Sequence, residues 1–91
     1  MNTPAKIQLA GQSVKVRVSS RPLKGCHGYA RKYAREIVIS KGLSRRQLLE
    51  VVLHEMQHMQ QWYLDEEIVE TMAAEQAEAL IALGLYDLKE T

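Results

Sequence analysis

The sequence predicts an α+β fold in which a small antiparallel sheet of about three strands packs on two long helices. Three observations support this prediction. Val14, Val16 and Val18 alternate with cationic residues, which is the period-two pattern of a half-buried strand. A second short β-branched run, REIVIS, spans residues 35 to 40. The C-terminal half then holds two long apolar-periodic stretches, which are bounded by helix-capping residues. The predicted element order is β-β-loop-β-α-α.

The N-terminal half supplies the predicted strands. Residues 6–20 contain two β-like runs around residues 10–12, and a hairpin is their simplest arrangement. Pro22 ends the second run, because proline cannot donate to a strand ladder. Residues 22–34 carry two glycines and are predicted to form a loop. The third strand is predicted over residues 35–40, and Gly42 closes it.

The C-terminal half supplies the predicted helices. Ser44 is a favourable N-cap for a helix over about residues 45–62. Asp65 is a second N-cap, for a helix over about residues 66–83. Gly84 follows at the position where a glycine commonly ends a helix. The two helices are therefore joined by a connection of only a few residues.

Length and composition indicate one globular domain over residues 1–91. The chain is 46% hydrophobic and 25% charged, which is typical of a folded protein rather than a disordered one. Cys26 is the single cysteine, so no internal disulfide can form. The N-terminus has no apolar core of signal-peptide length, and no run reaches the roughly 18 apolar residues of a membrane span. We expect a soluble cytoplasmic protein without a membrane partner.

Charge is distributed unevenly along the chain. Residues 1–46 hold 11 Lys or Arg and one acid, whereas residues 47–91 hold one Lys and 10 acids. The simplest interpretation is two solvated faces of opposite sign. A basic surface for nucleic acid or for an acidic protein is a second interpretation, and head-to-tail self-association is a third.

The motif HEMQH, residues 54–58, places three polar side chains in the predicted first helix. An apolar stripe runs beside it, formed by Leu49, Val52, Leu53, Met56 and Met59. A neighbouring stripe holds Val51, Glu55, His58 and Trp62, and the polar remainder holds Gln47, Glu50, Gln57 and Gln61. Because the apolar arc is wide, the helix should be largely buried. His54 and His58 then lie one turn apart on one face.

This spacing suits a catalytic zinc ion. Two imidazole nitrogens at positions i and i+4 can both approach Zn²⁺ at about 2.0–2.1 Å. A carboxylate beside the metal can accept a proton from a zinc-bound water molecule, whose pKa the ion lowers to about 7. HEMQH therefore predicts two metal ligands, His54 and His58, and a general base, Glu55.

The third ligand is expected among the acids of the second helix, because no histidine follows HEMQH. Val69, Met72, Ala73, Gln76 and Leu80 are predicted to face inward on that helix, and Glu66 and Glu70 lie at the edge of this face. Glu67 belongs to the outward stripe and is the weaker candidate. A tight helical hairpin would bring Glu70 level with His58, so the spacing alone leaves Glu66 and Glu70 open.

HEMQH followed by EEIVETMA resembles the gluzincin zinc metallopeptidases. More narrowly, it is similar to the ImmA/IrrE-type peptidases and to small phage and prophage proteins related to them. The resemblance covers residues 25–84. It implies that His54, His58 and Glu66 bind zinc, that the Glu70 carboxylate supports a ligand histidine, and that Glu55 is the catalytic base. It also implies that the REIVIS strand is a sheet edge that pairs with an extended peptide.

The implied activity is zinc-dependent hydrolysis of a peptide bond in a narrow protein substrate, in a phage or bacterial setting. Two features depart from the family pattern. Only seven residues separate His58 from Glu66, and the tyrosine or histidine that larger gluzincins use on the oxyanion has no clear counterpart. Four candidates for that role are Tyr29, Tyr33, His27 and Tyr63.

In a second hypothesis the chain binds zinc but does not catalyse hydrolysis. A small core gains stability from a metal, because assembly of the metal site is coupled to folding. The chain would then be a zinc-stabilised binding module, whose basic N-terminal face contacts nucleic acid or an acidic protein. Cys26 and His27 form a further pair of potential metal ligands, although such a dipeptide more often belongs to an ordinary loop.

Overall fold

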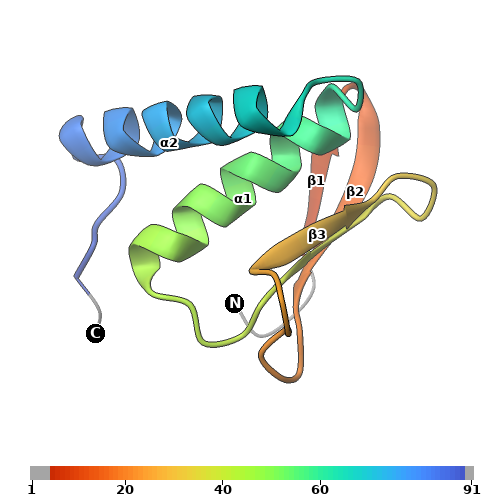
Figure 1. The fold of residues 1–91 in the computed structure, drawn as a ribbon, viewed down its shortest axis with the longest axis horizontal. Coiled ribbons are helices and arrows are strands. Elements are labelled where there is room, and N and C mark those ends of the chain that lie inside the picture. Colours follow the sequence, from red (N-terminus) through yellow and green to blue (C-terminus); the bar gives the residue numbers. More distant parts are fainter. Residues whose placement is uncertain (1–4, 90–91) are drawn as a thin grey trace.

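A computed structural model describes residues 5–89 of the chain. It has an α+β architecture with four strands and two helices (Figure 1). The strands are β1 (Ala5–Leu9), β2 (Gln12–Val18), β3 (Gly28–Arg31) and β4 (Glu36–Ile39). The helices are α1 (Arg45–Gln60) and α2 (Glu66–Ala82). The predicted fold class is confirmed.

The four strands form one mixed sheet in the order β1-β2-β4-β3. β1 and β2 form the predicted hairpin, in which Ile7 lies opposite Val14. β4 then runs parallel to β2, with Val16 opposite Ile37, and antiparallel to β3. The hairpin turn has two residues with positive φ, Ala10 at 51° and Gly11 at 75°, as expected for the tight turns that suit twisted strands.

Two details of the predicted sheet are wrong. Residues 22–34 are not one loop, because β3 lies within them. The sheet is not purely antiparallel, because β2 and β4 run in the same direction. The connection between these two strands contains β3, so the chain crosses to the sheet edge before it returns to the centre. REIVIS is consequently an interior strand, and β3 is the edge strand beside it.

Local sequence signals define both helices. The Ser44 hydroxyl accepts a hydrogen bond from the backbone N–H of Gln47, whose own side chain accepts from the Ser44 N–H, so a capping box begins α1. Asp65 occupies the N-cap position of α2 without a capping hydrogen bond from its side chain. Gly84 follows α2 with φ of 74°, as the sequence predicted.

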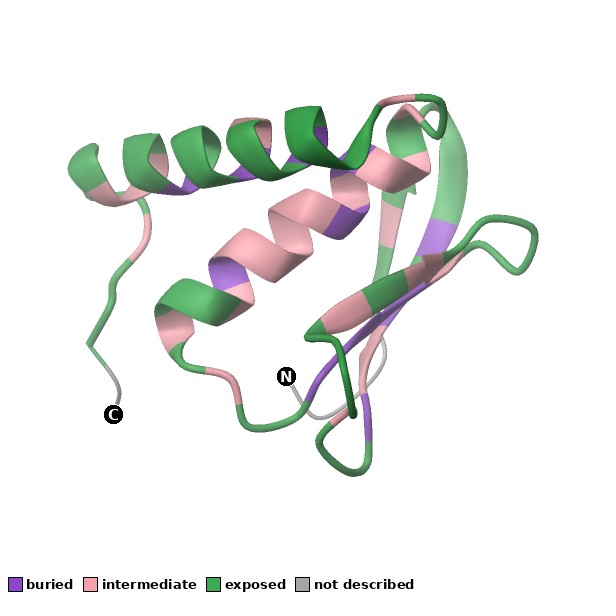
Figure 2. Cartoon of the chain, in the orientation of Figure 1, coloured by how far each residue is buried: buried purple, intermediate pink, exposed green. Residues whose placement is uncertain are grey.

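The core lies between the sheet and α1 (Figure 2). Five buried side chains of the sheet form it: Leu9, Val14, Val16, Ile37 and Ile39. Side chains of α1 pack against them, including Val51, Val52, Met56 and Met59. Within residues 5–89, α2 contacts α1 but not the sheet, so the elements stack as sheet, first helix and second helix. α1 is therefore covered on two sides, which explains its wide apolar arc.

Gln57 belongs to the interface between the helices rather than to a polar outer surface. It is buried, and its amide nitrogen donates to the side-chain oxygen of Gln76 on α2 at 2.7 Å. The prediction that Gln57 lies on the polar remainder of α1 is therefore wrong. Neither helix in the described part of the chain is long and apolar enough to cross a membrane.

Candidate metal centre

The two histidines of HEMQH converge at one point near the C-terminal end of α1. Because four residues span slightly more than one helical turn, their side chains lie side by side on the same face. The Nε2 atoms of His54 and His58 are 3.1 Å apart, and the ring centroids are 4.8 Å apart. Both residues are partly buried and line the cleft described below.

Glu66 from α2 completes the cluster. Its Oε1 lies 2.6 Å from His54 Nε2, and its Oε2 lies 2.9 Å from His58 Nε2. The three side chains can each offer one ligand atom, and these atoms lie within 4.8 Å of one another. Around a tetrahedral Zn²⁺ with bonds of about 2.0–2.1 Å, neighbouring ligand atoms are about 3.4 Å apart. The donors therefore need to separate by about 0.3–0.8 Å to hold the ion.

The connection between the helices determines which acid reaches the histidines. α1 ends at Gln60, and a turn closed by the Leu64 N–H and the Gln61 carbonyl leads directly into α2. The chain therefore folds back at once, and the first turn of α2 lies beside the last two turns of α1 (Figure 1). Glu66 is the first residue of α2 and meets both histidines.

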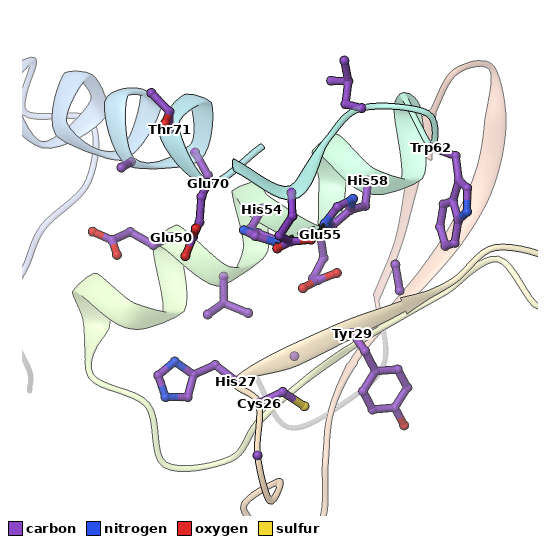
Figure 3. Close-up of a pocket in the computed structure, with 18 residues that line it drawn as sticks. Cys26, His27, Tyr29, Glu50, His54, Glu55, His58, Trp62, Glu70 and Thr71 are labelled. Atoms are coloured by element: carbon purple, nitrogen blue, oxygen red, sulfur yellow. Dashed lines mark hydrogen bonds and ion pairs between the residues drawn. The ribbon is translucent and has the colours of Figure 1, made fainter. Parts of the chain in front are cut away.

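Glu70 lies one turn further along α2, on the wall of the same cleft and nearer to Glu50 (Figure 3). Within residues 5–89, no hydrogen bond or ion pair joins Glu70 to His54 or His58. The structure thus brings Glu66, not Glu70, to the imidazoles. Glu67 is exposed on α2 and does not belong to the cluster.

Glu55 is the buried acid of the site, with only 8% of its surface exposed. Its carboxylate points from α1 toward the sheet, below the two imidazoles (Figure 3). Burial raises the pKa of Glu55, and the nearby Glu66 carboxylate acts in the same direction, whereas His54 and His58 favour the charged form. A carboxyl group with a raised pKa exchanges protons closer to neutral pH, which suits a general base.

A cleft of about 1030 Å³ opens in front of these side chains. One wall is α1 and the turn after it, with Val51, His54, Glu55, His58 and Trp62, which include the whole second stripe predicted from the sequence. The opposite wall is β3 and the residues before it, from Gly25 to Ala30, and α2 closes the end with Glu66 and Glu70. The site is therefore a groove between an edge strand and the HEMQH helix.

The close approach of β3 to α1 depends on Gly28. A Cβ atom at this position would lie 2.7 Å from Val51 Cγ1 and 2.9 Å from the Val38 carbonyl oxygen. β3, and with it this wall of the cleft, was not predicted from the sequence. The available signal was weak: Gly28 and Ala30 alternate with Tyr29 and Arg31, so the inward residues are too small to give the usual apolar pattern of a strand.

The candidate residues for the oxyanion are dispersed. Tyr33 and Tyr63 are highly exposed and do not line the cleft. Tyr29 lies on β3, but its ring points away from the histidines (Figure 3). His27 lines the cleft beside Cys26, and within the described residues these two join no group of three potential metal ligands.

No family model, no curated protein and no solved structure matches the chain. The chemistry of the site therefore has to be inferred from the side chains and their geometry. Two imidazoles and one carboxylate form a donor set that Zn²⁺ favours in sites that retain a position for water.

Proposed function

We propose that the protein is a zinc-dependent peptidase with a narrow protein substrate. His54, His58 and Glu66 would hold the ion, and Glu55 would be the general base. The observation that carries the proposal is the convergence of three ligand atoms beside a buried carboxylate at the floor of a cleft. A structural zinc site would usually be closed by four protein ligands. Only three potential ligands meet here among residues 5–89, which favours a site that admits water.

A zinc ion at this position would polarise a peptide carbonyl and lower the pKa of a water molecule. The chain's own residues supply the remaining functions. Glu55 is largely buried but lines the cleft, and it can hold the proton taken from water, then deliver it to the leaving amine. The groove between α1 and β3 can orient an extended peptide past these groups.

The edge of β3 supports a peptide rather than a compact small molecule as the substrate. β3 pairs with β4 on one side only, so its other edge offers backbone N–H and C=O groups to an added strand. The resemblance assigned this role to the strand over residues 35–40. Because that strand is interior, the proposal transfers the role to Gly28–Arg31.

The decisive comparison uses Glu55→Gln, which keeps the shape of the side chain but cannot accept a proton. We expect this variant to retain zinc and to lose about 10²–10⁴-fold in hydrolysis of a broad peptide library, followed by mass spectrometry. Glu50→Gln is the matched control, because Glu50 lines the same cleft from the same helix but lies away from the histidines (Figure 3). Equal activity of the parent and Glu55→Gln, or zinc-loaded parent without hydrolysis, would refute the peptidase. The second of these results would favour the zinc-stabilised binding module.

A further inference from the structure

The face of the sheet that points away from α1 carries a concentration of positive charge. Side chains alternate between the two faces of a strand, so the residues between the core positions lie on this outer face. Five of its charged residues are Lys6, Lys15, Arg17, Arg31 and Glu36. Neither helix of the described chain reaches this face, because α1 packs on the core side and α2 packs on α1.

The strand register lines these charges up across the whole sheet. Lys6 lies opposite Lys15, Lys15 opposite Glu36, and Glu36 opposite Arg31. With strands about 4.8 Å apart, this row is about 14 Å long. Arg17 extends the charge along β2, where it lies opposite Val38. The row together with Arg17 holds four cations and one carboxylate, which gives a net charge of +3.

The arrangement of these cations is costly for an isolated sheet. Like charges directly opposite each other on neighbouring strands are destabilising, and Lys6 and Lys15 form such a pair. Glu36 compensates the two arginines: Arg17 Nε donates to it at 3.0 Å, and an Arg31 N–H donates at 3.4 Å. Each guanidinium has five N–H donors, so both arginines retain donors that Glu36 does not use. The lysines lie on exposed positions.

An aromatic ring lies beside the cations. Tyr29 on β3 is opposite Val38, in the same cross-strand row as Arg17. Its side chain is 38% exposed, and its ring points away from the metal-binding histidines (Figure 3). Both lysines are exposed, and the Arg17 and Arg31 side chains are 37% and 58% exposed, so the cations and the ring are accessible together.

We propose that this outer face, defined by Lys6, Lys15, Arg17, Tyr29 and Arg31, binds single-stranded nucleic acid. Cations follow the phosphates of a strand, and an exposed ring stacks on a base without regard to its identity. Protein interfaces are depleted in lysine at their centres and enriched in apolar anchors, whereas this face has two lysines and its Val38 is only 1% exposed. Nucleic-acid interfaces are polar and strongly positive, as this face is. The inference does not rest on the peptidase proposal, although Tyr29 belongs to the strand that also borders the cleft.

The test measures the fluorescence anisotropy of a labelled oligothymidylate of about ten nucleotides with the full chain at several salt concentrations. Three neutralised phosphates predict a slope of about −2 for log K against log salt. In Lys6→Gln/Lys15→Gln we expect the salt dependence to become shallower, with a slope of about −0.7, and the binding at about 50 mM salt to weaken roughly 50-fold. The matched control, Lys41→Gln/Lys89→Gln, removes the same charge from exposed positions off this face and should bind like the parent.

A second variant distinguishes specific binding of nucleic acid from binding of any polyanion. Tyr29→Leu keeps an apolar side chain on β3 but removes the stacking surface, so we expect roughly tenfold weaker binding with an unchanged salt slope. Circular dichroism of each variant checks the fold. Absence of binding at low salt, or equal losses in the control and the Lys6/Lys15 variant, would overturn the proposal. If polyglutamate competes equally and Tyr29→Leu has no effect, the face recognises acidic polypeptides instead. Self-association abolished by Lys6→Gln/Lys15→Gln would identify a second copy of the chain as the occupant, and would also overturn it.

Discussion

Gly28→Ala tests how closely β3 packs against α1. The added methyl group would lie 2.7 Å from Val51 Cγ1 and 2.9 Å from the Val38 carbonyl oxygen, and contacts below about 3.0 Å require something to shift. Val51 can move by changing its rotamer, but the carbonyl oxygen belongs to the backbone of the central strand β4. Extra methyl groups in such packed positions cost about 1–3 kcal/mol. Gly28 does not have a positive φ, so the reduced entropy of the unfolded chain offsets about 0.4–1 kcal/mol of this cost.

We therefore expect Gly28→Ala to lower the free energy of unfolding by about 1–2 kcal/mol, measured by urea denaturation followed by circular dichroism. A double-mutant cycle with Val51→Ala distinguishes the two contacts. Shortening Val51 relieves the contact with Cγ1, so the double variant should be about 0.5–1 kcal/mol more stable than the sum of the single changes predicts. A Gly28→Ala variant as stable as the parent would mean that β3 lies farther from α1, and the cleft would lose its second wall.

Three further predictions concern single side chains. Arg17 and Arg31 lower the pKa of Glu36, so the ionised carboxylate stabilises the fold above its unfolded pKa of about 4.5, and this stability is lost as the pH falls. Urea unfolding at decreasing pH should show a loss of up to about 1 kcal/mol in the parent, and this loss should be absent in Glu36→Gln. Burial raises the pKa of Glu55, so ionisation of this carboxyl group lowers the stability of the fold as the pH rises. At pH 7, zinc-free Glu55→Gln should therefore unfold at a higher urea concentration than the zinc-free parent, and this difference should disappear in acid. The opposite order would contradict the burial of this carboxylate. Gln76→Leu leaves the buried Gln57 amide without its partner and should cost about 1–3 kcal/mol by thermal unfolding, whereas Gln57→Leu/Gln76→Leu should restore most of it; equal losses would show that the hydrogen bond has no role.

The features that sequence analysis predicted best are those set by local periodicity. HEMQH places His54 and His58 together because a helix repeats every 3.6 residues, whatever surrounds it. Ser44 and Gln47 form their capping box for the same local reason. The helix bounds consequently differ by only one or two residues from those predicted.

The missed features depend on contacts between distant segments. β3 has no apolar run, because α1 approaches so closely that Gly28 and Ala30 are the inward residues. The parallel pairing of β2 with β4 depends on the path of the chain through β3, which no pattern within either strand encodes. Gln57 is buried because α2 covers that side of α1 and supplies Gln76 as a partner.

The choice between Glu66 and Glu70 also depends on how one segment packs against another. Both acids lie on the same side of α2, so helical periodicity alone could not separate them. The turn over Gln61 and Leu64 fixes where α2 begins relative to α1, and this places the first turn rather than the second beside the histidines. The family resemblance had assigned the ligand position to Glu66, and in the structure the carboxylate oxygens of Glu66 lie 2.6 and 2.9 Å from the two imidazoles.

The zinc content of the chain purified without chelators, measured by elemental analysis alongside thermal unfolding, tests the metal centre most directly. We expect about one zinc per chain in the parent and in Glu70→Gln, a strong loss in Glu66→Gln, and stabilisation by about 2.7 kcal/mol when free zinc is 100-fold above its Kd. A folded parent that contains no zinc and gains no stability from it would contradict the metal centre, and Glu66→Gln with undiminished zinc would contradict the ligand set.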